Sequence, residues 1–241
     1  MKTLSDFLAA YSQVIARRDE EAGRREVCHP PIVLSREIGS GGRRIAEALA
    51  GRLGFVLCDK QILDELAERA KVPKDFLAML DERPAKALEL LGASLLRGVS
   101  LTPEDYERVL KSGLRALLRL GSVVIVGRGA IFLAEPGKAL RVRVVAPRHL
   151  RIKNLMNYEN ISDQEAAKRI EKIEKERAEF LRRYFGAEEA RADCFDIAVN
   201  TECLSIENCV DLIMEAYKKL FKCGEQIVGP AAQNLNTSKH P

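Results

Sequence analysis

Residues 31–46 place three segments of different character in immediate succession. A short β-branched run at 32–34 follows two prolines and is typical of a strand buried on both faces. The turn that follows contains Gly39, Gly41 and Gly42. Such glycines let several backbone N–H groups converge on one anion. From Ile45 onward apolar residues recur at helical spacing, so the turn leads into a helix N-terminus, which carries partial positive charge. The segment therefore predicts a strand, a phosphate-binding loop and a helix.

A second short strand at 54–58 follows this helix and ends in Asp59. The chain thus begins with a strand, a loop, a helix and a strand, and the residues from Gly39 to Asp59 resemble the start of the cytidylate kinases. The segment 35–46 resembles more closely the divergent cytidylate kinase-like branch. The alignment has no gap from Gly39 to Asp59, and the residues that match are Gly39, Ser40, Gly41, Ala46, Leu49, Ala50, Arg52, Leu53, Gly54, Phe55 and Asp59. The resemblance extends over about residues 31–221. It is firm at 31–59, 122–130 and 195–213 and loose from 60 to 121.

The loop departs from the usual P-loop pattern Gly-x-x-x-x-Gly-Lys-Ser/Thr at three positions. Arg36 replaces the first glycine, Gly42 the lysine and Arg43 the hydroxyl residue. The backbone cradle remains, and cations are available from other positions. The residues expected to bind ATP phosphates are Gly39, Ser40, Gly41, Gly42, Arg43 and Arg44. Arg36, at the end of the first strand, is expected to turn over the loop toward the phosphates, whereas Arg43 is expected along the outer surface of the helix.

A continuous apolar run at 122–126 ends in Gly-Arg-Gly, which is typical of a central parallel strand that leads into a loop. Because ligands of open α/β sheets bind at the carboxyl edge, Arg128 is expected in the cleft. It matches the arginine of a Gly-Arg-Asp motif in the cytidylate kinases, but the aspartate position is Gly129. The resemblance implies that Asp59, Lys60, Arg128 and Glu174 lie on the monophosphate side.

Two helical segments after a fourth strand at 140–145 resemble the arginine-rich lid of these kinases. Arg148 and Arg151 follow that strand, and a capping box at 162–165 opens a helix that is expected to end near residue 183. Along it, Glu171, Glu174 and Arg177 keep an Asp-x-x-Asp-x-x-Arg spacing, which predicts an ion pair between Glu174 and Arg177. The alternative is that this charged helix simply presents a solvated face. The resemblance assigns catalytic positive charge to Arg36, Arg148, Arg151 and Arg177.

The segments combine into an α/β fold of three layers, a P-loop NTPase fold with a parallel sheet of about five strands. The expected domain spans 28–223, with a helical monophosphate-binding insert at about 60–121 and a lid at about 147–190. An amphipathic helix and linker at 1–27 precede it, and residues 224–241 are expected to be disordered. The apolar stripe of the first helix comprises Leu4, Phe7, Leu8, Tyr11, Val14 and Ile15. It can dock on this chain's own domain or form a contact between copies, and both alternatives stay open.

Composition excludes several other classes of protein. Thirty-nine basic and 35 acidic residues give a net charge of +4 without a basic, aromatic-rich stripe, so nucleic-acid binding is not expected. No apolar run is long enough to cross a membrane. Six cysteines without a CxxC pair favour reduced thiols in a cytoplasmic protein, and no metal-ligand set is assigned.

The resemblance implies a reaction of ATP and Mg²⁺ with a small-molecule nucleotide, most simply CMP or dCMP, which yields ADP and the diphosphate. Phosphoryl transfer needs fixed cations more than covalent chemistry. The acceptor already offers an anionic oxygen, so no general base is expected. The alternative is a catalytically impaired nucleotide-binding module with a regulatory or assembly role, because the lysine, the loop hydroxyl and the Gly-Arg-Asp aspartate are missing.

Overall fold

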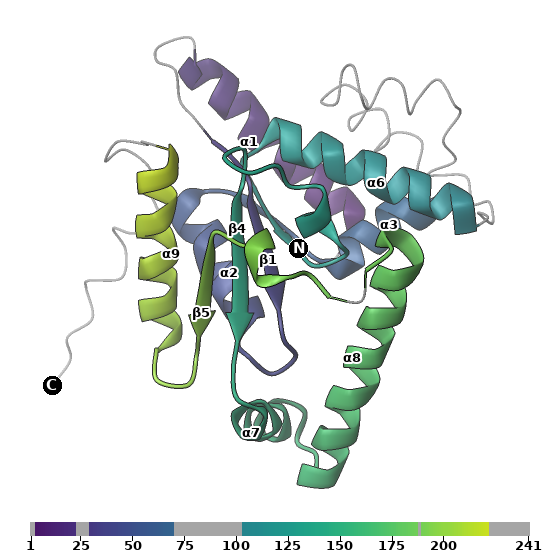
Figure 1. The fold of residues 1–241 in the computed structure, drawn as a ribbon. Helices are drawn as coiled ribbons and strands as arrows, with labels where there is room; N and C mark the ends of the chain where they lie inside the picture. The colour runs from purple at the N-terminus through teal and green to yellow at the C-terminus, as the bar shows by residue number, and fades with distance from the viewer. Residues whose placement is uncertain (1–2, 23–28, 70–102, 188, 222–241) are drawn as a thin grey trace, which may run out of the picture.

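The computed structural model describes residues 3–22, 29–69, 103–187 and 189–221. Part of the predicted insert, 70–102, and the predicted tail, 224–241, lie outside the described residues. In the described chain the strands form one parallel sheet in the order β2-β3-β1-β4-β5 (Figure 1). Their bounds are β1 (Ile32–Arg36), β2 (Val56–Cys58), β3 (Val123–Val126), β4 (Leu140–Val145) and β5 (Ile197–Asn200). The predicted five-stranded parallel sheet is confirmed.

The central position of β1 explains where a ligand can bind. From β1 the chain moves to β2 and β3 on one side, and then crosses to β4 and β5 on the other. The loops after β1 and β3 therefore leave the carboxyl edge in opposite directions. Such a reversal opens a crevice between neighbouring strands. The glycine loop and the Gly-Arg-Gly loop both border this crevice.

Helices cover both faces of the sheet and complete the three predicted layers. On one face lie α2 (Gly42–Leu53) and α9 (Ile206–Phe221), which share an apolar cluster with Ile32 and Leu34. On the other lie α1 (Leu4–Ala22), α3 (Lys60–Arg69) and α6 (Pro103–Leu120), which share a cluster with Val33. Successive residues of β1 thus enter opposite cores, as expected of a strand buried on both faces.

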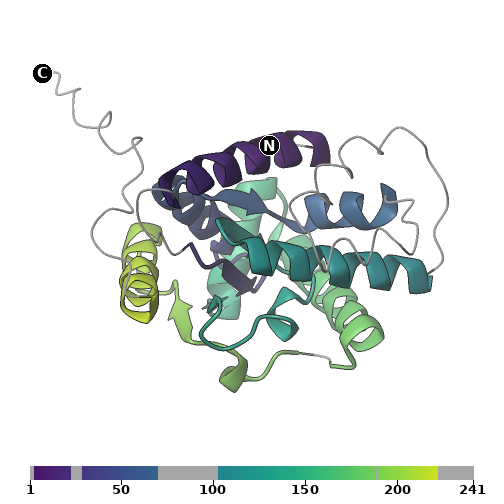
Figure 2. The ribbon, with the colours of Figure 1, turned by 90° about the horizontal axis from the view of Figure 1, so that it is seen from above.

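The stripe of α1 is covered by this chain. Five of its apolar side chains are buried in the cluster that includes β2, α3 and α6: Leu4, Phe7, Leu8, Tyr11 and Ile15. The Tyr11 hydroxyl donates to the Gly121 carbonyl at 2.7 Å, and the Leu4 N–H donates to the Glu65 carboxylate at 2.9 Å. Seen from above, α1, α3 and α6 lie side by side (Figure 2). The burial of this stripe matches the first of the two alternatives for α1, docking on its own domain.

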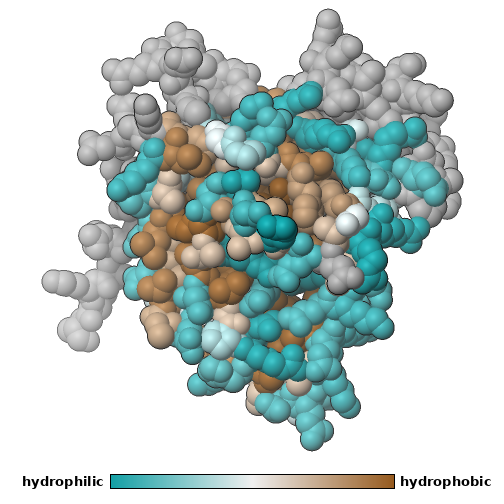
Figure 3. Space-filling view, viewed as in Figure 1, coloured by the Kyte–Doolittle hydropathy of each residue, from teal (hydrophilic) through white to brown (hydrophobic). Residues whose placement is uncertain are grey.

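A hairpin of α7 (Arg148–Glu159) and α8 (Asp163–Phe185) extends from the carboxyl edge of the sheet (Figure 1). The predicted capping box is present, because Ser162 accepts from the Glu165 N–H and Glu165 accepts from the Ser162 N–H. Hydrophilic residues cover most of this hairpin in Figure 3, as its charged sequence predicts. The C-terminal end of α8 is held by aromatic contacts. There the Phe185 ring stacks on Phe132 of the short helix η1 (Ala130–Phe132), with 5.4 Å between the ring centroids.

A second short helix, η2 (Ala192–Cys194), leads from the hairpin into β5. Among the described helices, none combines the length and the hydropathy needed to cross a membrane.

Candidate active site

The glycine loop is held from outside by side chains that contact its carbonyl groups. Asn154 of α7 donates to the Gly39 carbonyl at 2.8 Å, and Thr201 donates to the Ser40 carbonyl at 3.0 Å. Gly41 caps α2 with a positive φ of 77° and provides no side-chain cap for the first N–H groups of that helix. These N–H groups are therefore available to an anion, as at other helix N-termini that bind phosphate.

Arg36, the last residue of β1, lies beside the loop as the sequence predicts. Its stem fills the space next to Gly42, where an added Cβ would lie 2.6 Å from the Arg36 Cβ. Its guanidinium reaches the Gly127 backbone. Burial, reinforced by the like charge of Arg177, lowers the pKa of Arg36 from 12.5 to about 10. No carboxylate of the described residues lies within 4.0 Å of the Arg36 guanidinium.

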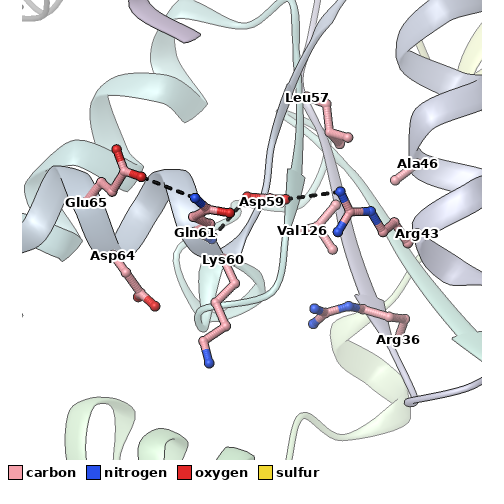
Figure 4. Close-up of a pocket in the computed structure, with 10 residues that line it drawn as sticks. All are labelled: Arg36, Arg43, Ala46, Leu57, Asp59, Lys60, Gln61, Asp64, Glu65 and Val126. Carbon is pink, nitrogen blue, oxygen red and sulfur yellow. Dashed lines mark hydrogen bonds and ion pairs between the residues drawn. The ribbon is translucent and has the colours of Figure 1, made fainter. Parts of the chain in front are cut away.

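A cavity of about 520 Å³ separates the start of α2 from the start of α3 (Figure 4). Arg36 and Arg43 line one side, and Asp59, Lys60 and Asp64 line the other. Asp59 accepts the backbone N–H groups of residues 61 and 62 and lies 3.9 Å from Arg43. It therefore caps α3 while facing the loop. The Arg43 side chain is 70% exposed and pairs with Glu47, in line with the expected position on the outer surface of α2.

A second cavity, of about 730 Å³, lies between the carboxyl end of β1, the loop at 127–129 and α8. Its basic lining residues are Lys60, Arg36, Arg128, Arg143, Arg169, Lys172 and Arg177, and its acidic ones are Glu37, Glu174, Glu176 and Glu189. The basic side chains outnumber the acidic ones among the described residues, so this cavity favours an anion. Arg36 and Lys60 line both cavities, which therefore adjoin.

Arg177 reaches the crevice from α8 and donates to the Arg36 carbonyl at 2.9 Å. Burial lowers the pKa of Arg177, and Glu174 opposes that effect. The predicted ion pair between Glu174 and Arg177 is wrong, because Glu174 instead binds Arg151 of α7 at 2.5 Å. Arg151 is only 8% exposed, and a buried guanidinium requires a carboxylate partner. The packing of α7 on α8 therefore decides which arginine pairs with Glu174, and the three-residue spacing along α8 does not.

Three of the predicted cations do not line either cavity in the described structure. Arg148 is exposed and pairs with Glu171 at 2.6 Å. Arg151 is held by Glu174 and lies 3.5 Å from Glu37. Arg44 is exposed on α2. The catalytic or phosphate-binding roles of these residues stay predictions.

Arg128 lies in the crevice as predicted, and its partner is a residue that has no predicted role. Asp64 of α3 accepts from Arg128 Nε at 2.6 Å and from Nη2 at 2.5 Å. The Phe180 ring of α8 covers the guanidinium at 4.3 Å. The one sequence signal for Asp64 is its spacing of four from Lys60, which places both on one face of α3.

Glu37 is a second residue without a predicted role. Its carboxylate accepts the Ala146 N–H at 3.1 Å and lies within 4.0 Å of Arg143 and Arg151. It thereby connects the end of β1 with the end of β4 and with the α7–α8 hairpin. Its position next to Arg36 can be read from the sequence, but its contacts with residues 143, 146 and 151 cannot.

The described residues contain no group of three or more His, Cys, Asp or Glu side chains able to hold a metal ion. The hydroxyl of Ser40, a different loop position from the missing one at Arg43, donates to the Glu37 carbonyl at 2.9 Å. Asp59 is the carboxylate that faces the loop across the first cavity.

Comparison with known proteins places this site in a family. The chain is 28% identical over 127 residues to a cytidylate kinase of Staphylothermus marinus, a match of 52% of this chain and 65% of that protein, or just under two thirds. It is 27% identical over 187 residues to a cytidylate kinase of Ignicoccus hospitalis, a match of 76% of this chain and 95% of that protein.

A crystal structure of an uncharacterized protein from Eubacterium ventriosum shares the fold, with a TM-score of 0.58 and 21% identity over 78% of this chain and 97% of that one. The family model described as the cytidylate kinase-like family matches residues 31–203, which include the glycine loop, the Gly-Arg-Gly loop and the α7–α8 hairpin. This chain belongs to the cytidylate kinase-like family.

Proposed function

We propose that this protein transfers the γ-phosphoryl group of MgATP to a nucleoside monophosphate, with CMP or dCMP as the preferred acceptor. One observation carries the proposal. Arg36 and Arg177 are partly buried next to the glycine loop, and no carboxylate of the described residues lies within 4.0 Å of either guanidinium. Because a buried unpaired cation is costly, such a pair favours an anionic ligand between them.

The donor nucleotide belongs at the glycine loop. There the backbone N–H groups of residues 39–43 and the start of α2 would bind the β-phosphate. Arg36 would supply the cation that a P-loop lysine provides elsewhere. Mg²⁺ would arrive on the ATP phosphates and keep most of its water ligands, and Asp59 is one of the carboxylates that line this cavity.

The acceptor belongs in the second cavity, whose lining is mainly basic. Arg128 and Arg177 would bind its phosphate group. The preference for CMP or dCMP rests on the two relatives that are named cytidylate kinases. Such nucleotides are cytoplasmic substrates, and a cytoplasmic location is part of the proposal.

The reaction needs no general base. An anionic oxygen of the acceptor phosphate attacks the γ-phosphorus in line and forms the new P–O bond. The bond between that phosphorus and the β,γ-bridging oxygen breaks, and ADP leaves with the electron pair. Arg36, which borders both cavities, would neutralise charge on the transferring group, and such preorganised charge is the main catalytic term in phosphoryl transfer.

The test is an ADP-release assay with MgATP and a panel of CMP, dCMP, AMP, GMP and UMP. We expect the highest kcat/KM with CMP or dCMP. Binding of ATP without turnover of any monophosphate would instead support the second candidate, a catalytically impaired nucleotide-binding module. That candidate is favoured by one observation, the absence of a lysine and a hydroxyl at Gly42 and Arg43.

A further inference from the structure

The position after Arg128 has no room for a side chain. Gly129 has a φ of 72°, and an added Cβ would lie 2.1 Å from Cε2 of Phe185. Phe185 is fixed there by its stacking on Phe132. The aspartate that follows this arginine in the Gly-Arg-Asp motif is therefore excluded by the packing of the end of α8.

Arg128 nevertheless has a carboxylate partner, supplied by another part of the chain. Asp64 binds two of its nitrogens in a bidentate pair, and the Tyr106 hydroxyl donates to Asp64 at 3.0 Å. Burial raises the pKa of Tyr106, which keeps the hydroxyl protonated as a donor. With Phe180 over its face and a side chain only 16% exposed, the guanidinium has one defined orientation.

The direction of approach leaves the other edge of the guanidinium available. Asp64 lines the first cavity, whereas Arg128 lines the second, so the pair forms part of the wall between them. An arginine carries five N–H donors, and Asp64 engages one on Nε and one on Nη2. Of the remaining three, one on Nη1 and one on Nη2 form the edge opposite Nε.

We infer that Asp64 is a positioning residue for Arg128 and that it replaces the missing aspartate of the Gly-Arg-Asp motif. Asp64 holds the guanidinium so that its free edge binds the phosphate of the acceptor in the second cavity. This inference rests on the proposed function, since it takes a nucleoside monophosphate as the ligand. A preoriented arginine loses little side-chain entropy when the phosphate binds.

The test compares Asp64→Asn with a matched control, Asp196→Asn. Asp196 forms a similar bidentate pair with Arg141, at 2.6 and 3.1 Å, and the side-chain exposures are close, 13% and 24% against 16% and 22% for Arg128 and Asp64. Neither Arg141 nor Asp196 lines either of the two cavities described above. We expect Asp64→Asn to raise the KM for CMP about tenfold to a hundredfold, the range for hydrogen bonds to a charged group, with the KM for ATP unchanged.

Two further variants, together with the control, separate positioning from a general loss of structure. Tyr106→Phe should raise the KM for CMP in the same direction but less, and Asp64→Glu should restore part of the affinity. Asp196→Asn should change the melting temperature but neither KM. If Asp64→Asn does not fold, the Tyr106→Phe variant alone decides, and an unchanged KM for CMP there overturns the inference.

Calorimetric titration of CMP without ATP distinguishes this inference from the proposed function. If the wild type turns over no monophosphate but binds CMP more tightly than Asp64→Asn does, the proposed function fails and the positioning role stands. Equal affinity in the two proteins overturns the positioning role. Tighter binding to Asp64→Asn also overturns it, because Asp64 would then compete with the phosphate. A wild type that binds no monophosphate overturns both.

Discussion

Replacement of Arg36 by methionine should make this protein more stable and much less active. The stem of Arg36 packs beside Gly42, and methionine preserves that stem while removing the buried charge. The fall in the pKa of Arg36 from 12.5 to about 10 corresponds to a penalty of about 3 kcal/mol on the charged form in the folded protein. Because the folded-state pKa is the lower one, this penalty is fully present below about pH 10 and disappears as the pH rises toward the ordinary pKa of arginine.

At neutral pH the substitution should therefore raise the free energy of unfolding by about 1–3 kcal/mol. For a domain of this size, each kcal/mol corresponds to about 2–4 °C in melting temperature. The same substitution should lower kcat about 10²- to 10³-fold, the scale for losing one preorganised charge donor. A gain in stability with a loss of activity is the expected signature of a functional buried charge.

The matched control is Arg43→Met, because Arg43 lines the same side of the cavity as Arg36 but is 70% exposed. Its pair with Glu47 is a surface pair, so its removal should change stability by less than about 1 kcal/mol and kcat less than Arg36→Met does. Thermal unfolding and steady-state kinetics with MgATP and CMP measure both effects. A lower melting temperature in Arg36→Met would refute the reasoning, since the guanidinium would then stabilise the fold. Full activity in that variant would remove Arg36 from the mechanism.

Three further predictions follow from the same contacts. Gly42→Lys alone should lower activity and stability, because its Cβ meets Arg36. The double variant Gly42→Lys with Arg36→Gly should recover part of the catalytic rate that the single variant loses. Equal rates in the single and double variants would argue against interchangeable cations. Deletion of residues 1–25 should lower the melting temperature without changing the subunit number in light scattering; a dimer that dissociates would contradict docking in cis. Arg177→Ala should reduce kcat far more than ATP affinity, and an equal loss for the exposed Arg182→Ala would indicate a general effect of charge.

The elements of the fold could be predicted because their signals are local. The run at 122–126 contains no polar residue after Ser122, and four consecutive buried residues form β3. The capping box at 162–165 marks the start of α8 within four residues, and it forms as expected. Patterns of this kind depend on neighbours in the sequence, so one chain without relatives is sufficient to find them.

Most of the site could not be predicted, because its contacts join distant segments. Arg128 and Asp64 are 64 positions apart, and no periodicity relates them. The Glu174–Arg177 prediction used helix spacing and was wrong, since Arg151 lies closer to Glu174 once α7 packs on α8. In a helix with many charged side chains, local spacing offers several partners of nearly equal energy. The choice among them depends on burial, which only the folded structure provides.

Two of the departures from the family pattern, at Gly42 and at Gly129, can be followed in space. At Gly42 the lysine is absent, and the stem of Arg36 fills the vacated volume while its guanidinium lines both cavities. At Gly129 the aspartate is absent, the Phe185 ring fills that volume, and Asp64 supplies a carboxylate to Arg128. Among the described residues, no carboxylate lies within 4.0 Å of the partly buried guanidinium of Arg36. A module that only scaffolds an assembly gains nothing from keeping such a charge, which costs stability. The site of this chain thus has the charges of the family pattern on different residues, and this favours the kinase over the impaired module.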